Sequence, residues 1–234
     1  MPAGLGAPAM HTLTAVAPAD VPCVAALYAN VFAANPAYGS IFQSSEKRER
    51  IAALEWLFAR RLQALLAAGN PFFMTRDPAS GEVCGAGGVI LPGTYPGLLD
   101  FLWHGMAAWP LLWGWGSMLR ALALDQRLGA GEASEGGAIA HLSMLAVRPE
   151  SRGIASALIT RLLEDAPRGS RVMLTTQDSG AVALYQRHGF RVLVESQVAP
   201  RGSSTTFTSW SMVLGRGQVA DRRAPSGPKN DTGG

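Results

Sequence analysis

The sequence has little cysteine, little net charge and no long run of basic residues, and each shortage removes a class of protein. Cys23 and Cys84 are the only cysteines in 234 residues and lack CxxC spacing, so neither a disulfide framework nor a zinc site is predicted. The formal net charge is only +3, and there are no Lys/Arg blocks of the kind that bind nucleic acid. We therefore expect no metal and no nucleic-acid partner, whereas an anionic small ligand is compatible with this charge.

The N-terminus also lacks a basic region followed by an apolar run, which argues against a secretory signal and for a cytoplasmic location. Hydrophobic residues make up 48% of the chain, a composition that predicts folding. We expect a flexible leader over 1–10, one domain over 11–215 and a disordered tail over 216–234, where Gly, Pro, Arg and Asp offer nothing to bury.

Hydrophobic periodicity predicts an alternation of strands and helices. The predicted helices span 21–36, 45–68, 154–166 and 179–189, and the predicted strands span 11–16, 71–77, 82–91, 138–147, 171–177, 190–199 and 205–214. Ser45 is the expected cap of its helix, Gly69 its expected stop, and Pro36 the expected end of the first helix. The order favours an α/β (α+β) domain with a largely antiparallel sheet.

A tryptophan-rich segment over 101–124 is long enough to cross a bilayer and carries only His104 and Arg120 as titratable groups. Pro110, three glycines and the even spread of the tryptophans argue against spanning. We interpret the segment as a buried or pocket-lining helical pair broken at Pro110. Attachment to a membrane through this segment is the alternative.

The stretch MLAVRPESRGIASALI, over 144–159, passes abruptly from an apolar strand to a helix. A helix start collects unpaired N–H groups and attracts phosphate, Gly153 permits close approach, and Arg152 adds positive charge. The alternative interpretation of the same residues is an ordinary tight turn between a strand and a helix, in which glycine is needed only for its backbone conformation. The chain has no GxxxxGK[ST] motif and no GxGxxG at this turn, which excludes the two common nucleotide-binding loops.

The run HLSMLAVRPESRGIASALI, followed by LTTQDSGAVALYQRHGF, resembles the acyl-CoA-binding core of the GCN5-related N-acetyltransferases (GNAT), in particular the branch that acetylates small amines. The resemblance implies a GNAT-like fold with a mixed, mostly antiparallel sheet flanked by helices and a helical Trp-rich insertion. It also implies acetyl-CoA as cosubstrate. The implied reaction is acetyl transfer to a primary amine of a small molecule by direct attack through a tetrahedral intermediate.

The resemblance also implies a set of site residues. Those expected to bind the cosubstrate are Leu145, Ala146, Val147, Arg152, Gly153, Ile154, Ala155, Ser156, Asp178, Ala181 and Tyr185. Tyr185 is the expected general acid, because a phenol is protonated at neutral pH. His141 is one candidate base, with Glu132, Glu135 or water as alternatives. The expected walls of the acceptor pocket are Phe32, Trp103, Trp109, Trp113 and Trp115.

Two departures from the family pattern leave other functions open. The turn before Ile154 is two residues shorter than usual, so either Glu150 or Arg152 stands at the usual Arg/Gln position. Asp178 replaces the usual Asn. A catalytically inactive CoA-binding or sensory module is therefore one alternative, and a protein or peptide N-acetyltransferase is another. The expected assembly is a monomer or a homodimer.

Overall fold

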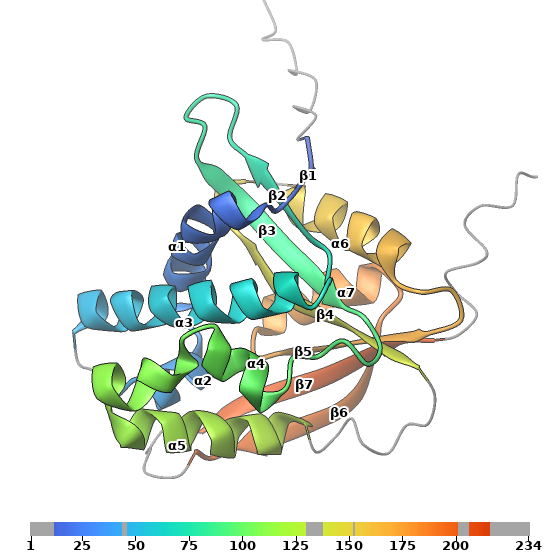
Figure 1. Cartoon of the computed structure of the whole chain (residues 1–234). Helices are drawn as coiled ribbons and strands as arrows, with labels where there is room; N and C mark the ends of the chain where they lie inside the picture. Colours follow the sequence, from blue (N-terminus) through green and yellow to red (C-terminus); the bar gives the residue numbers. More distant parts are fainter. Residues whose placement is uncertain (1–11, 44–45, 130–137, 152, 201–205, 216–234) are drawn as a thin grey trace, which may run out of the picture.

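The computed structural model describes residues 12–43, 46–129, 138–151, 153–200 and 206–215, and all described strands belong to one sheet (Figure 1). The strand order is β1-β2-β3-β4-β5-β7-β6. Neighbouring strands are antiparallel except β4 and β5, which are parallel. The strands are β1 (Thr14–Ala15), β2 (Phe72–Arg76), β3 (Val83–Ile90), β4 (Ile139–Val147), β5 (Arg171–Thr176), β6 (Arg191–Val198) and β7 (Phe207–Leu214). The predicted fold class is confirmed.

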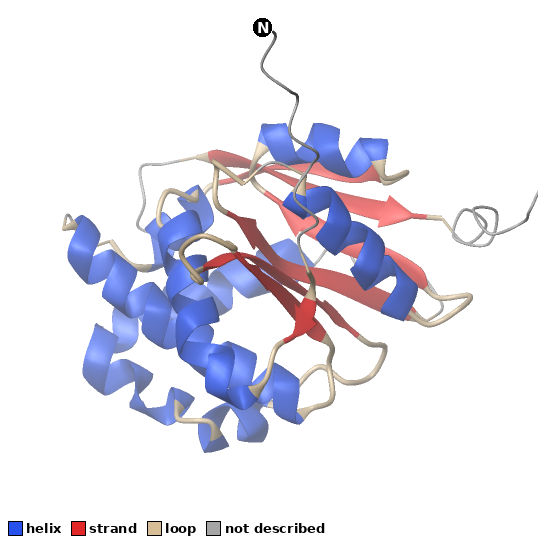
Figure 2. Ribbon diagram, turned by 90° about the horizontal axis from the view of Figure 1, so that it is seen from above, coloured by secondary structure: helices blue, strands red, loops and turns tan. Residues whose placement is uncertain are grey.

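Helices cover both faces of this sheet (Figure 2). They are η1 (Pro18–Asp20), α1 (Val21–Phe32), α2 (Pro36–Ile41), α3 (Lys47–Ala67), α4 (Leu98–Trp103), η2 (Met106–Ala108), α5 (Trp109–Gly129), α6 (Ile154–Asp165) and α7 (Ser179–Arg187). One buried cluster packs α1 and α3 with Phe72 of β2, and a second packs α6 with the adjacent Phe73. Because successive strand residues point to opposite faces, the two clusters lie on opposite sides of the sheet.

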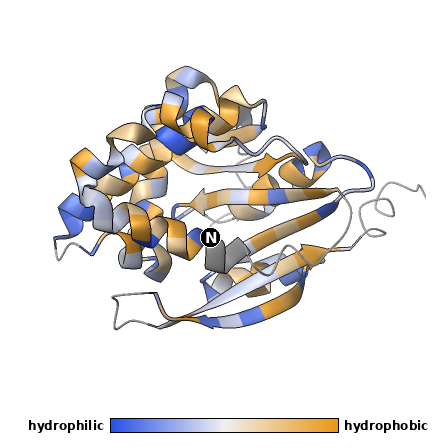
Figure 3. Cartoon of the chain, turned by 60° about the horizontal axis from the view of Figure 1, so that its bottom comes forward, coloured by the Kyte–Doolittle hydropathy of each residue, from blue (hydrophilic) through white to orange (hydrophobic). Residues whose placement is uncertain are grey.

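Apolar residues therefore recur along both the helices and the strands (Figure 3). The hairpin of β2 and β3 forms where predicted, and its turn closes with the Asp77 N–H donating to the Glu82 carbonyl at 2.8 Å. Gly69 follows α3 with a φ of +81°, which confirms the predicted stop. The predicted cap Ser45 lies outside the described residues, and Glu46 holds the N-cap position without a side-chain bond.

Two predicted elements differ from the structure at the N-terminal side. The strand predicted over 11–16 is only two residues long in β1, because β1 pairs with β2 through two residues. The first helix ends at Phe32, and Pro36 begins the separate helix α2. Asn35 caps α2, since its Oδ1 accepts from the Ala37 N–H at 2.9 Å, and proline suits the first turn because it lacks an N–H.

The tryptophan-rich segment forms a pair of helices, α4 and α5, as predicted, and the break between them comes before Pro110. Pro110 is the second residue of α5, where its missing N–H costs nothing. Helix α5 is itself interrupted at Gly114, with φ 78° and ψ 150°. Within the part of the chain that the structure describes, no helix is long and apolar enough to traverse a lipid bilayer. The predicted leader and tail, and Glu132 and Glu135, lie outside the described residues.

Candidate functional site

The parallel strands β4 and β5 stop pairing partway along their length. Their register runs from Ile139↔Arg171 to His141↔Met173, yet β4 continues to Val147. In this region β4 also carries an irregularity opposite β3, and Met144 adopts a φ of 51°. A bulge of this kind re-aims the strand. Beyond His141 the edge of β4 that faces β5 is left with backbone groups that a ligand can bind.

The turn after β4 delivers the start of α6 next to this edge. The Arg148 N–H donates to the Cys84 carbonyl at 2.9 Å, and the Ser151 N–H donates to the Arg148 carbonyl at 3.0 Å. Gly153, at the N-cap of α6, has a φ of +83°, and a Cβ added there would meet no atom within 4 Å. Glycine therefore provides both the left-handed conformation and open space. Arg152 lies outside the described residues.

The first turn of α6 has the properties of an anion site. The N–H groups of Ile154, Ala155 and Ser156 have no carbonyl partner within the helix, and no side chain caps them. The helix dipole adds partial positive charge at this end. Ala155 and Ser156 are half-buried, whereas Ile154 is fully buried and anchors the turn.

A glycine in β3 allows α6 to come this close to the sheet. A Cβ added to Gly85 would lie 2.5 Å from Cγ2 of Ile154, closer than real side chains approach. The absence of a side chain at Gly85 thus sets where α6 begins, and thereby the position of the amides in its first turn.

Helix α7 places Asp178 and Tyr185 at the same region. Asp178 is the N-cap: its Oδ1 accepts from the Gly180 N–H at 2.8 Å, and its own N–H donates to Thr176 Oγ1 at 3.2 Å. Its carboxylate therefore serves as a helix cap. Ala181 packs beside the cluster that contains Tyr185.

The ring of Tyr185 is buried, and it packs edge-on against Phe190 with centroids 5.8 Å apart. Burial, and to a lesser extent the charge of Asp178, raises the pKa of the Tyr185 phenol. The phenol is therefore protonated throughout the physiological pH range and is available as a proton donor. Tyr185 shares its cluster with Leu142 of β4 and Ile154 of α6, and Leu145 and Val147 pack against that cluster.

Two further contacts tie the surrounding elements together. His188, at the C-cap of α7, places Nε2 3.1 Å from Ser156 Oγ and so links the end of α7 to the first turn of α6. His141 is half-buried at the last position where β4 pairs with β5. The structure thus brings the predicted base to the point where the two strands separate, and its role stays a prediction.

The aromatic residues predicted to form one wall are distributed over three environments. Trp103 is 89% exposed, whereas Trp109 is buried, stacks on Phe42 and donates to Ser117 Oγ at 2.8 Å. Trp113 lines a pocket of about 270 Å³ between residues 42–43, α3 and α5. Phe32 packs in an aromatic group with Tyr28, Tyr38 and Phe58.

Trp115 is exposed, as Trp103 is. The expectation of a single tryptophan wall over an acceptor pocket therefore does not describe Trp103 or Trp115.

Two side-chain hydrogen bonds, which the sequence does not reveal, link three distant segments. Asn35 Nδ2 donates to Gln177 Oε1 at 3.2 Å, and Gln177 Nε2 donates to Ser209 Oγ at 3.2 Å. They join the start of α2 to the end of β5 and to β7. Asn35 before Pro36 is a recognisable cap, but its second partner is 142 residues away and leaves no local signal.

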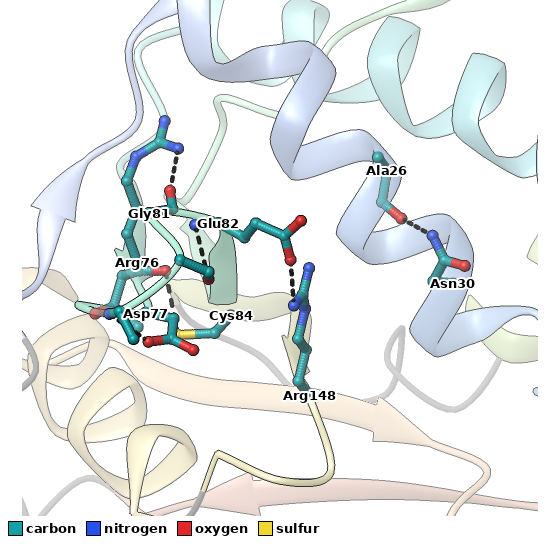
Figure 4. A network of polar contacts seen from close by, with 11 residues as sticks. Ala26, Asn30, Arg76, Asp77, Gly81, Glu82, Cys84 and Arg148 are labelled. Carbon is teal, nitrogen blue, oxygen red and sulfur yellow. Dashed lines mark hydrogen bonds and ion pairs between the residues drawn. The ribbon is translucent and has the colours of Figure 1, made fainter.

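A pocket of about 760 Å³ was also missed by sequence reasoning. Its lining comes from α1, from the β2–β3 hairpin and from residues 148–150. Figure 4 shows its polar contacts: Arg148 pairs with Glu82 at 2.7 Å, and Arg76 donates to the Gly81 carbonyl at 3.0 Å. Cys23 lines this pocket with an exposed thiol, whereas Cys84 is buried.

Similar proteins share both the domain and the fold. Residues 116–208 match a family model described as an acetyltransferase (GNAT) domain. No curated protein matches the sequence.

Solved structures match over most of the chain. One from Corynebacterium glutamicum, described as histone acetyltransferase HPA2 and related acetyltransferase, is 19% identical, with 86% of this chain and 94% of that chain covered and a TM-score of 0.56. A GNAT superfamily phosphinothricin acetyltransferase from Sinorhizobium meliloti, in complex with AcCoA, is 16% identical and has a TM-score of 0.54. The match covers 95% of this chain and 97% of that chain.

An N-acetyltransferase from Staphylococcus aureus is 15% identical, with 87% and 96% covered and a TM-score of 0.51. At these identities the structural matches establish the fold alone, which is that of the GNAT acetyltransferases. Residues 116–208 thus match a GNAT acetyltransferase domain, and the solved structures show that the chain has the fold of the GNAT acetyltransferases.

Proposed function

We propose that this protein transfers an acetyl group from acetyl-CoA to the primary amine of a small molecule. The observation that carries the proposal is the separation of β4 from β5 directly beside the open first turn of α6 and the buried ring of Tyr185. An unpaired strand edge suits an extended amide-containing arm, and a helix start with free amides suits a pyrophosphate.

The residues present fit this cosubstrate. The amides of Gly153, Ile154, Ala155 and Ser156 would hold the pyrophosphate, with no Cβ to block approach at Gly153. Main-chain groups of residues 145–147 would hold the pantetheine arm and orient the acetyl carbonyl, where a preorganised N–H supplies about 3 kcal/mol of transition-state stabilisation. Acetyl-CoA supplies the reactive thioester.

Proton movement is assigned to two side chains. As the amine nitrogen bonds to the acetyl carbon and the carbon–sulfur bond breaks, the Tyr185 hydroxyl gives its proton to the departing sulfur. The raised pKa of Tyr185 keeps that proton in place until it is needed. His141 accepts the proton that the amine loses, with water as the alternative acceptor.

The substitution of Asp178 for the family's Asn does not remove the helix cap. Its Oδ1 accepts the Gly180 N–H, which an Asn carbonyl oxygen at that position would also do. This supports an active enzyme over an inactive CoA-binding module. The structural neighbours have names as different as phosphinothricin acetyltransferase and histone acetyltransferase, so the choice between a small and a protein amine rests on experiment.

The decisive experiment measures thiol release from acetyl-CoA across a panel of polyamines, aminoglycosides and peptides. We expect turnover with a small amine and none with the peptides. Tyr185→Phe is expected to lower kcat by about a hundredfold or more while the Kd for acetyl-CoA is unchanged, because the ring stays and only the proton donor is lost. Acetyl-CoA binding without thiol release for any amine would identify the inactive module instead.

A further inference from the structure

The exposed hydrophobic side chains of the described residues are concentrated on one segment. Ten of the eleven large hydrophobic residues that are exposed belong to the stretch from Tyr95 to Leu122, and the eleventh is Val194 of β6. We call the ten the α4–α5 face: Tyr95, Leu98, Leu99, Leu102, Trp103, Leu111, Leu112, Trp115, Leu119 and Leu122. Figure 1 shows α4 and α5 together at the lower side of the molecule, away from the β2–β3 hairpin.

Helix α5 is apolar on both of its sides. Trp109 and Leu124 are buried in the core, whereas Leu111 before the interruption at Gly114, and Trp115 and Leu119 after it, are 89%, 65% and 60% exposed. A helix that is hydrophobic all round is normally buried all round. The outer side of α5 therefore has the composition of a covered surface.

The segment that carries this face is not needed to connect the sheet. Strands β3 and β4 are antiparallel neighbours, so a hairpin loop of about 2–5 residues would join them. Instead the chain runs from Ile90 through α4, η2 and α5 before it returns at Ile139. The chain therefore departs from the shortest connection to form the helices that carry the α4–α5 face.

Few charges lie within the stretch from Tyr95 to Leu122. Arg120 donates from Nε and Nη2 to the Ile41 carbonyl at 3.0 and 2.8 Å, and Asp100, which is exposed, accepts the Gly97 N–H at 2.8 Å. A mostly apolar face is complementary to itself in a two-fold contact. Helices that lie on lipid carry a Lys/Arg-rich face opposite the apolar one, whereas the opposite side of α5 packs on the core.

The size of the face matches that of a subunit interface. The ten residues are between 40% and 89% exposed, so at roughly 150 Å² for each fully exposed large side chain they present on the order of 1,000 Å² of surface in total. Monomeric proteins rarely expose patches above about 300–600 Å², and a stable interface buries about 800 Å² on each partner. We propose that a second copy of this chain covers the α4–α5 face, so that the protein is a two-fold symmetric dimer.

The test is the mass of the full-length protein in solution, measured by light scattering after gel filtration and by sedimentation velocity. We expect a dimer for the wild type. Leu119→Glu and Trp115→Glu are expected to raise the dimer Kd by on the order of a hundredfold, because each would bury an unpaired charge at the interface. Both side chains are more than half exposed in the single chain, so the fold should be kept, which circular dichroism checks.

Val194→Glu is the matched control, since Val194 is exposed but lies on β6, and it should leave the dimer intact. A monomeric wild type, or a Trp115→Glu variant that stays dimeric, overturns the proposal. Flotation of a monomeric wild type with vesicles of neutral and anionic phospholipids would assign the face to a bilayer and would equally overturn it.

Discussion

Tyr28 shows how a single buried hydroxyl affects stability. Its side chain is fully buried between α1 and α3, and its hydroxyl lacks a hydrogen-bond partner. Burial, with a smaller effect of Tyr38, raises the pKa of this phenol well above its ordinary value of about 10. An unpaired hydroxyl costs desolvation energy without a compensating bond.

We therefore expect Tyr28→Phe to keep or increase the free energy of unfolding at neutral pH, by up to about 1 kcal/mol. Because the pKa is higher in the folded chain than in the unfolded chain, the stabilising contribution of the neutral phenol is complete below about pH 10 and is lost as the pH rises further. Urea unfolding between neutral and alkaline pH should show a shallower loss for Tyr28→Phe than for the wild type. An identical loss in the two proteins would contradict this account.

Asp178 combines a helix cap with a charge near Tyr185, and two substitutions separate these effects. Asp178→Asn keeps the acceptor for the Gly180 N–H and removes the charge, so we expect little change in stability and a lower pKa of Tyr185. Asp178→Ala removes both and should cost about 1 kcal/mol of unfolding free energy. Urea denaturation measures the change in unfolding free energy, and alkaline absorbance titration of the tyrosinate measures the change in the pKa of Tyr185. Equal destabilisation by Asn and Ala would refute the capping role.

At the scale of single elements, Gly85 of β3 determines where α6 begins. In Gly85→Ala, the new Cβ would lie 2.5 Å from Cγ2 of Ile154, so α6 must shift or the core must rearrange. We expect a loss of about 1–3 kcal/mol in unfolding free energy. A weaker Kd for acetyl-CoA should accompany it, because the amides of the first turn move.

Gly39→Ala is the control, since a Cβ at this position in α2 meets nothing within 4 Å and alanine favours helix. It should be neutral or slightly stabilising, and its acetyl-CoA affinity should equal that of the wild type. Calorimetric titration measures both affinities. An unchanged Kd for Gly85→Ala would show that α6 can move without effect on the site.

Elements were predictable from the sequence where apolar spacing was regular. Strands β4 and β5 and helices α6 and α7 form within one or two residues of their predicted bounds, because turn residues bound a clear apolar pattern in each. Helix α2 was missed because Pro36 reads as a stop as easily as a start. The bulge at Met144 has no sequence signature, since residues other than glycine rarely adopt positive φ.

The tryptophan-rich segment resisted prediction for a different reason. When both sides of a helix are apolar, periodicity does not distinguish the buried side from the exposed side. Sequence reasoning thus placed Trp103 and Trp109 on one wall, although one is 89% exposed and the other is buried. Contacts between distant segments, such as that of Asn35 with Gln177, depend on the tertiary fold and could not be predicted from local sequence either.

At the scale of the whole molecule, three surfaces compete as ligand sites: the opening between β4 and β5, the pocket of about 760 Å³ beside α1, and the α4–α5 face. Our proposal predicts that acetyl-CoA binds the first alone. Binding to the folded state should raise the melting temperature, with about 2.7 kcal/mol of stabilisation when the ligand is at a hundred times its Kd.

Hydrogen exchange tests which surface is used. Acetyl-CoA should slow exchange of backbone amides over 142–147 and 154–156, because these groups gain hydrogen bonds or lose water. Amides of α1, of the β2–β3 hairpin and of α5 should exchange as before, apart from the uniform slowing that global stabilisation causes. Coenzyme A without the acetyl group should protect the same segments, since the pyrophosphate and pantetheine contacts remain. Protection centred on the α1 pocket would instead place the cosubstrate in the pocket lined by α1, the β2–β3 hairpin and residues 148–150, and would remove Tyr185 from the reaction.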